Sequence, residues 1–188
     1  MSKITGSESR IFDLDLGSPA LGGVADVLAA VTDDGTEQTI TTGFTDPPTP
    51  RVISASSAGT TTDIKAIQVT VNGTDEFDEP LTEVLPIFTV NTATTVTGLK
   101  VFKTITSVVI PAHDGNEATT SFGLGNTLGL GMLLTRNSVV GTFFGGVREA
   151  TLPTVNFSAS AIESNSILLD SALDGSAVLV DYYEPSPV

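Results

Sequence analysis

The chain has no cysteine and no tryptophan, and basic residues are scarce. Without cysteine there can be no disulfide, thiolate nucleophile or cysteine-based zinc site, so redox chemistry does not indicate a compartment. The 8 lysines and arginines stand against 22 acidic residues, a formal net charge of −14. A protein that binds nucleic-acid phosphates or an anionic membrane needs clustered lysines and arginines on its surface. We therefore expect neither nucleic acid nor a membrane as a partner.

Long apolar runs are also missing. The first ten residues contain no apolar signal core, so secretion by a standard signal peptide is not expected. The most apolar region, 123–147, is interrupted by Arg136 and many glycines and does not resemble a membrane helix. Valine, isoleucine and threonine are abundant instead, which favours strands. The 188 residues suffice for one sizeable core or two small ones.

The segment 67–112 is the centre of the predicted fold. Ile67, Val69 and Val71 alternate with polar residues, the pattern of a strand with one buried face. The elements predicted after this start are an acidic turn over 75–79, a strand over 81–90 and a strand over 98–111. In the last strand Val101 and Phe102 are both apolar, so the pattern does not decide which of them faces the core.

Turn residues divide the rest of the chain into short elements. The Asp-Gly turn at 34–35 predicts a hairpin between 24–31, which would also suit helical turns, and 37–43. Prolines at 47–50 break the chain before a strand over 52–55, and a loop opens at Ala58-Gly59. Further strands are predicted over 119–122, 132–134, 139–144, 155–157, 167–169 and 177–183.

About ten short strands at intervals of about 8–12 residues are typical of a sandwich or barrel. We therefore predict an all-β fold, a single-domain β-sandwich or jelly-roll-like barrel. Residues 1–23 form an extended N-terminal arm, in which Asp13 and Asp15 face away from the apolar side chains, and residues 24–188 form the domain. Such an arm either reaches a neighbouring subunit or frays.

No set of residues points to catalysis, a metal or a cofactor, and we predict none of these. The acidic turn 75–79 has oxygen ligands but not the spacing of a calcium loop. The carboxylate pairs Asp13–Asp15 and Asp33–Asp34 show no apolar pocket pattern of a glycosidase. His113 adjoins Asp114 in a turn without a nucleophile motif, and we expect it to be solvent-exposed.

The glycines at 123, 125 and 129 are spaced too widely for a dinucleotide-binding loop. No helix is predicted after them to hold a pyrophosphate. We expect these glycines to supply positive φ angles at turns and bulges.

Four groups of residues resemble, in the usual order, a widespread group of small virion proteins of tailed bacteriophages. They are Pro50-Arg51-Val52, then Val71–Asp75 with Leu81-Thr82-Glu83, then Gly98–Phe102 through Ile105, Val108 and Pro111-Ala112, then Gly123-Leu124-Gly125 with Leu128–Leu130. The resemblance covers about residues 45–135. The group usually has glycine where Asp78 stands and aspartate where Asn126 stands.

The resemblance implies a β-rich structural protein of the virion, a capsid cement (decoration) protein on the major capsid protein shell. It would act on the capsid surface after assembly in the host cytoplasm. A homotrimer would match the local threefold positions of a capsid lattice. The alternatives are a tail, baseplate or head–tail connector component and, secondly, a carbohydrate hydrolase.

Overall fold

The computed structural model describes residues 10–184. This part has fourteen strands in antiparallel pairs and two 3-10 helices, which confirms the predicted all-β sandwich-like class. The elements are β1 (Arg10–Asp15), β2 (Leu28–Thr32), β3 (Gln38–Ile40), β4 (Arg51–Gly59), η1 (Thr61–Asp63), β5 (Thr70–Thr74), β6 (Pro80–Val84), β7 (Thr95–Phe102), β8 (Thr104–Ile110), β9 (Ala118–Gly129), β10 (Val139–Phe144), β11 (Val147–Arg148), β12 (Thr154–Asn156), η2 (Ile162–Ser164), β13 (Ser166–Leu168) and β14 (Val178–Glu184).

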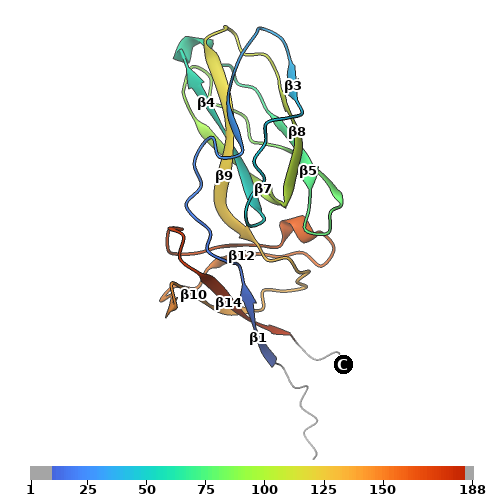
Figure 1. Cartoon of the computed structure of the whole chain (residues 1–188), viewed down its shortest axis with the longest axis vertical. Coiled ribbons are helices and arrows are strands. Elements are labelled where there is room, and N and C mark those ends of the chain that lie inside the picture. Colours follow the sequence, from blue (N-terminus) through green and yellow to red (C-terminus); the bar gives the residue numbers. More distant parts are fainter. Residues whose placement is uncertain (1–9, 185–188) are drawn as a thin grey trace, which may run out of the picture.

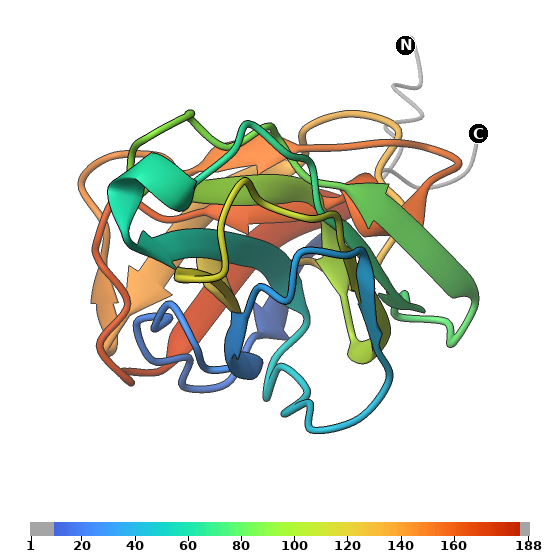
Figure 2. The ribbon, with the colours of Figure 1, turned by 90° about the horizontal axis from the view of Figure 1, so that it is seen from above.

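Two sheets form a sandwich in the upper part of Figure 1. One has the strand order β3-β8-β5-β6, and the other contains β9, β4 and β7, with β2 paired to β9. Figure 2 looks down the long axis onto the end of this sandwich, where η1 lies. The first hydrophobic core consists of Val27, Leu28, Ile53, Ala55, Ile67, Val69, Val71, Leu81, Leu85, Phe88, Phe102, Ile105, Val108, Ile110 and Phe122.

A further sheet, here called the terminal sheet, lies at the lower end of Figure 1 in the order β1-β14-β10-β11. It combines strands from both ends of the described chain. It packs on a second core that includes Leu128 and Leu130 near the end of β9, Ile167 from β13, and Val178 and Val180 from β14. The 12-residue strand β9 pairs with β4 and, further along, with β13, so one strand connects both cores.

The first part of the central segment forms the predicted hairpin, but its first strand begins at Thr70 rather than at Ile67. Ile67, Val69 and Val71 are buried in the first core, and β5 pairs with β6 across the acidic turn. β6 ends at Val84, so the strand predicted over 81–90 is shorter than expected. The buried side chains Leu85 and Phe88 follow it in irregular backbone.

The single strand predicted over 98–111 is wrong. The chain breaks at Lys103 into β7 and β8, which belong to opposite sheets of the sandwich. Val101 and Phe102 are both buried, although neighbouring residues of a strand point to opposite faces. β7 is therefore covered on both faces where it ends, and the two adjacent apolar residues mark the crossing.

The hairpin predicted around Gly35 is also wrong. The turn itself forms, with Gly35 at φ +81°, but β2 pairs with β9 while β3 pairs with β8 on the opposite sheet. The buried carboxylate of Asp33 accepts hydrogen bonds from the N–H groups of Gly35 (3.0 Å) and His113 (3.1 Å). The turn residues thus determine where the chain bends. Which sheet each of the two strands joins is decided by its pairing with a strand that is distant in sequence.

The glycines of 123–129 do not supply positive φ angles, and the strand predicted over 119–122 does not end there. They lie inside β9, which bulges against β4. A Cβ atom on Gly123 would collide with the backbone of Gly23 and Val24, and one on Gly125 with the side chain of Val52. These glycines therefore allow close approach of neighbouring segments. Ala58-Gly59, expected to open a loop, also pairs with β9.

Four of the later strand predictions are confirmed in β10, β12, β13 and β14, and Gly145, Gly146 and Gly175 turn with positive φ. The strand predicted over 132–134 is wrong, because this segment is a loop that begins after Gly131 at φ +63°. The N–H of Leu134 donates to the side chain of Asn165 (3.1 Å) rather than to a strand. The tail after β14 lies outside the described residues.

Of the predicted N-terminal arm, residues 1–9 lie outside the described residues. Residues 10–15 form β1, which pairs with β14 over six residues without a register shift. Leu16, which follows β1, is buried in the second core. This part of the arm therefore belongs to the terminal sheet of its own chain.

The buried side chain of Arg51 connects the segment after β1 to the strands of the sandwich. It is 1% exposed; its Nε donates to the carbonyl of Gly125 (2.7 Å) and its Nη1 to that of Ala20 (3.1 Å). Its Nη2 has no hydrogen-bond partner among the described residues. Burial lowers the pKa of Arg51, an effect that the charge of Asp26 opposes. The guanidinium holds the segment after β1 against β4 and β9.

Candidate interaction surface

His113 is buried, which corrects the expectation of an exposed turn histidine. Its Nδ1 accepts a hydrogen bond from the N–H of Lys65 (3.2 Å), so the ring proton lies on Nε2 and is donated to Oγ1 of Thr120 (3.1 Å). The ring stacks on Phe88, with centroids 6.3 Å apart. Burial lowers the pKa of His113. Both ring nitrogens are hydrogen-bonded within the fold. The neutral ring of His113 therefore holds the loop that contains Lys65 against β9.

Two of the other candidate carboxylates support local structure. Asp34 accepts hydrogen bonds from the N–H and Oγ1 of Thr36, at 3.0 and 2.8 Å, which lower its pKa. Asp114 pairs with Lys65, with 3.3 Å between Oδ1 and Nζ and both side chains about half exposed. Each contact stabilises a turn or a loop.

Asp13 and Asp15 are separated in role. Asp13 lies opposite Asp181 in the β1–β14 ladder. Burial raises the pKa of Asp181, and so do a hydrogen bond with Asp13 and the negative charge of Asp13. The positive charge of Arg148 acts in the opposite direction. Asp15 accepts a hydrogen bond from the N–H of Gly17 (2.8 Å). The Asp13–Asp181 pair lies on the terminal sheet and lines neither of the two pockets described below.

The acidic turn over residues 75–79, here called the tip, is built around one inward-facing side chain. Asp75 is buried, and its Oδ1 accepts hydrogen bonds from the N–H groups of Phe77 (2.8 Å) and Glu79 (3.1 Å). The N–H of Asp75 also donates to the carbonyl of Glu79 (3.0 Å). The tip is therefore fixed in shape by its own hydrogen bonds.

Asp78 adopts the conformation that glycine favours, with φ +62°. Its Oδ1 forms an ion pair with Nζ of Lys103 (2.9 Å), which raises the pKa of Lys103. Phe77, the residue before it, is 59% exposed. The tip thus presents a phenyl ring to solvent between carboxylates.

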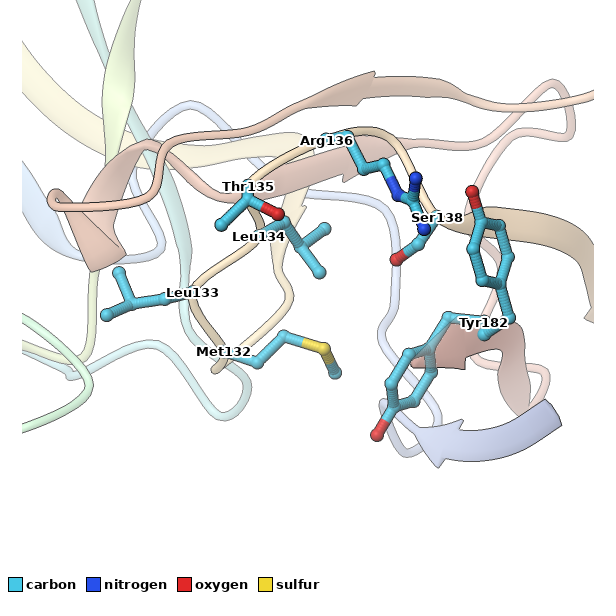
Figure 3. Close-up of a pocket in the computed structure, with 8 residues that line it drawn as sticks. Met132, Leu133, Leu134, Thr135, Arg136, Ser138 and Tyr182 are labelled. Atoms are coloured by element: carbon cyan, nitrogen blue, oxygen red, sulfur yellow. The ribbon is translucent and has the colours of Figure 1, made fainter. Parts of the chain in front are cut away.

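A pocket of about 270 Å³, here called the Arg136 pocket, opens between the loop after β9 and the end of β14 (Figure 3). Met132 and Leu134 face Tyr182 across the hollow, and Arg136 and Ser138 lie along one side. The lining residues are Met132, Leu133, Leu134, Thr135, Arg136, Ser138, Tyr182 and Tyr183. The walls are apolar and aromatic, with one cation at the rim.

Aromatic rings continue from this pocket to the edge of the terminal sheet. The guanidinium of Arg136 lies over the ring of Tyr183, 5.1 Å from its centroid. Tyr182 stacks on Phe12 of the edge strand β1, with centroids 5.7 Å apart. Next to Phe12, Ile11 is 66% exposed. Arginine and tyrosine are enriched at protein interfaces, and both tyrosines of the chain lie here.

The lysines and the exposed arginines of the surface differ in their ion pairs. The exposed lysines Lys65, Lys100 and Lys103 each pair with a carboxylate of the chain. Among the side chains that the structure describes, none of the exposed arginines Arg10, Arg136 and Arg148 forms such an ion pair. No pattern in the sequence led us to predict this pocket, although the adjacent tyrosines at 182 and 183 were a signal that could have indicated it.

A second pocket of about 340 Å³ lies between β1, the proline-rich segment and the loop after β9. Its lining includes two carboxylates, Asp15 and Glu76, together with Pro48, Pro50 and Leu130. Glu76 belongs to the tip, so the tip and the terminal sheet border the same hollow.

Within residues 10–184, no group of three or more histidines and carboxylates is arranged to hold a metal ion. The same part of the chain has no helix of the length and apolarity needed to cross a membrane. Comparisons with protein-family models, curated proteins and solved structures each gave no match.

Proposed function

We propose that this chain is a non-enzymatic structural protein of a tailed-bacteriophage virion that binds the major capsid protein shell as a cement protein. The observation that carries the proposal is the ordered set of four residue groups that resemble phage virion proteins. They occupy the start of β4, the β5–β6 hairpin, β7 with β8, and β9. All of these strands belong to the sandwich, and the last group extends along β9 to Leu128 and Leu130 of the second core.

The chemistry of the described surface supports this proposal. The candidate catalytic residues His113, Asp33 and Asp75 are buried and hydrogen-bonded within the fold. The Arg136 pocket has the apolar, aromatic and arginine composition of a protein contact. A cement protein binds through numerous weak contacts, which sum to high avidity when copies associate, for example as a trimer.

Binding to capsid shells tests the proposal directly. Purified protein is sedimented with empty shells assembled from the major capsid protein. We expect saturable binding in a fixed ratio to the capsid subunits and a raised melting temperature of the shells. Protein that stays in the supernatant at every concentration would contradict the cement role.

The alternative of a tail, baseplate or connector component makes a different prediction. Such a component would sediment with isolated tails or portals rather than with shells, and it would form a sixfold or twelvefold ring.

A carbohydrate hydrolase is the third possibility, and the pocket with Asp15 and Glu76 is where its two carboxylates would lie. Replacing both by their amides, Asp15→Asn and Glu76→Gln, would abolish any hydrolysis of host-envelope polysaccharide. Activity that is absent from the wild type, or unchanged in this double variant, would exclude that site.

A further inference from the structure

The tip and the Arg136 pocket are complementary in shape and chemistry. The tip presents the exposed ring of Phe77 next to the exposed carboxylates of Asp78 and Glu79. The Arg136 pocket offers apolar walls and a cationic rim. A cavity of about 150 Å³ is enough to hold a benzene ring. A pocket of about 270 Å³ therefore has room for a phenyl group.

We propose that the tip of one copy of this protein docks into the Arg136 pocket of a second copy. The ring of Phe77 enters between Met132 and Tyr182, where sulfur–aromatic and ring–ring contacts are available. The neighbouring carboxylate of Glu79 reaches the guanidinium of Arg136 at the rim, a charge-assisted contact, while Asp78 stays paired with Lys103. Asp75 holds the tip in its shape beforehand, so little conformational freedom is lost on docking.

The opposite charges of the tip and of the pocket rim favour a second copy as the occupant. At a net charge of −14, copies repel each other over most of their surfaces. Where the acidic tip of one copy meets the cationic rim of another, the local charges are opposite and the two copies attract each other. Because the two halves are different surfaces of the same chain, the contact either repeats reciprocally in a dimer or closes into a ring such as a trimer.

The tip contact rests on the proposed function in one respect: a cement protein is expected to self-associate, and the tip and the Arg136 pocket are where its copies would meet. The two stand apart in experiment. A protein that associates through the tip but does not bind shells would refute the cement role alone. A monomer that still coats shells would refute the tip contact alone.

Two exposed positions allow a sharp test by light scattering coupled to gel filtration. Phe77→Ser removes the ring from the tip, and Arg136→Glu reverses the rim of the pocket. We expect the wild type to form a closed oligomer and each variant to associate at least about thirtyfold more weakly, as for the loss of an interface hot spot. Leu133→Ser is a second pocket variant, should Arg136→Glu fail to fold.

Mixing the two variants gives the decisive result. The Arg136→Glu protein keeps an intact tip and the Phe77→Ser protein keeps an intact pocket, so an equimolar mixture regains one contact and forms a one-to-one complex. Phe157→Ser makes the same change at another exposed ring, and Lys65→Glu reverses the charge of another exposed cation; both should leave the oligomer intact. A monomeric wild type, variants that remain oligomeric, or a mixture that stays monomeric would each overturn the proposal.

Discussion

Replacing Asp78 tests how the tip is held in its conformation. Its φ of +62° lies in the left-handed region, which costs an ordinary L-residue about 1–2 kcal/mol and aspartate somewhat less. The ion pair with Lys103 offsets part of this cost. Both side chains reach solvent, with 38% of Lys103 and 69% of Asp78 exposed, so water screens the pair and it contributes little.

Glycine and alanine at this position separate the two effects. Asp78→Gly removes the backbone strain and the ion pair together and adds freedom to the unfolded chain, so we expect a stability within about 1 kcal/mol of the wild type. Asp78→Ala loses the ion pair and keeps the strain. It should be less stable than the glycine variant by about 1 kcal/mol.

Urea unfolding at constant m-value measures both differences. Lys103→Ala serves as the background in which the ion pair is already gone, so only the backbone effect remains there. If alanine and glycine at position 78 gave the same free energy of unfolding in this background, the left-handed conformation of the tip would be refuted.

Three further predictions concern the cores and the buried histidine. Phe102→Ala should lower the free energy of unfolding by about 3–5 kcal/mol, because this ring is fully buried; a loss under about 1 kcal/mol would show that its face is wrong. Gly123→Ala should cost at least about 1–3 kcal/mol, because its Cβ would meet backbone that cannot move aside; an unchanged urea midpoint would refute the close approach. The pKa of His113 is lowered in the folded state, so the unfolded chain takes up the proton first and stability should fall as the pH drops below about 6.5. His113→Gln should lose this part of the slope in urea midpoints between about pH 7.5 and 5, and an identical slope in both proteins would contradict the assignment.

The sequence predicted the elements better than their partners. Period-two alternation located β14 within one residue and identified the buried face of β5, although β5 begins three residues later than predicted, at Thr70. The strand over 98–111 was wrong because apolar residues continue through the point where the chain changes sheets. Within the run, only the adjacent apolar residues Val101 and Phe102 signal the break at Lys103, whose N–H donates to the carbonyl of Thr74 across the sandwich edge (2.9 Å).

Glycine and histidine were misread for a similar reason. A glycine that prevents a collision looks the same in sequence as one that turns the chain, and Gly123 is of the first kind. A histidine in a turn sequence is buried when distant groups satisfy both nitrogens, as Lys65 and Thr120 do for His113. In each case the conformation or burial of the residue is decided by a contact with a residue distant in sequence, which local sequence patterns do not reveal.

The Arg136 pocket could be predicted only in part, through its adjacent tyrosines, because it is assembled from two distant segments. The loop over 132–138 was expected to contain a strand, and its approach to Tyr182 depends on the pairing of β10 with β14. The tip, in contrast, was predicted as an acidic turn. What the sequence did not indicate is that Asp75 turns inward and leaves Phe77 exposed.

The cement role is tested most directly by counting and locating the copies of this protein in purified virions. Quantitative mass spectrometry combined with an electron cryomicroscopy reconstruction gives both the number and the position. The proposal predicts a copy number in fixed proportion to the major capsid protein, with density of the shape of the sandwich and terminal sheet on the capsid surface. Only a few copies per particle, or density confined to the tail or portal, would contradict it.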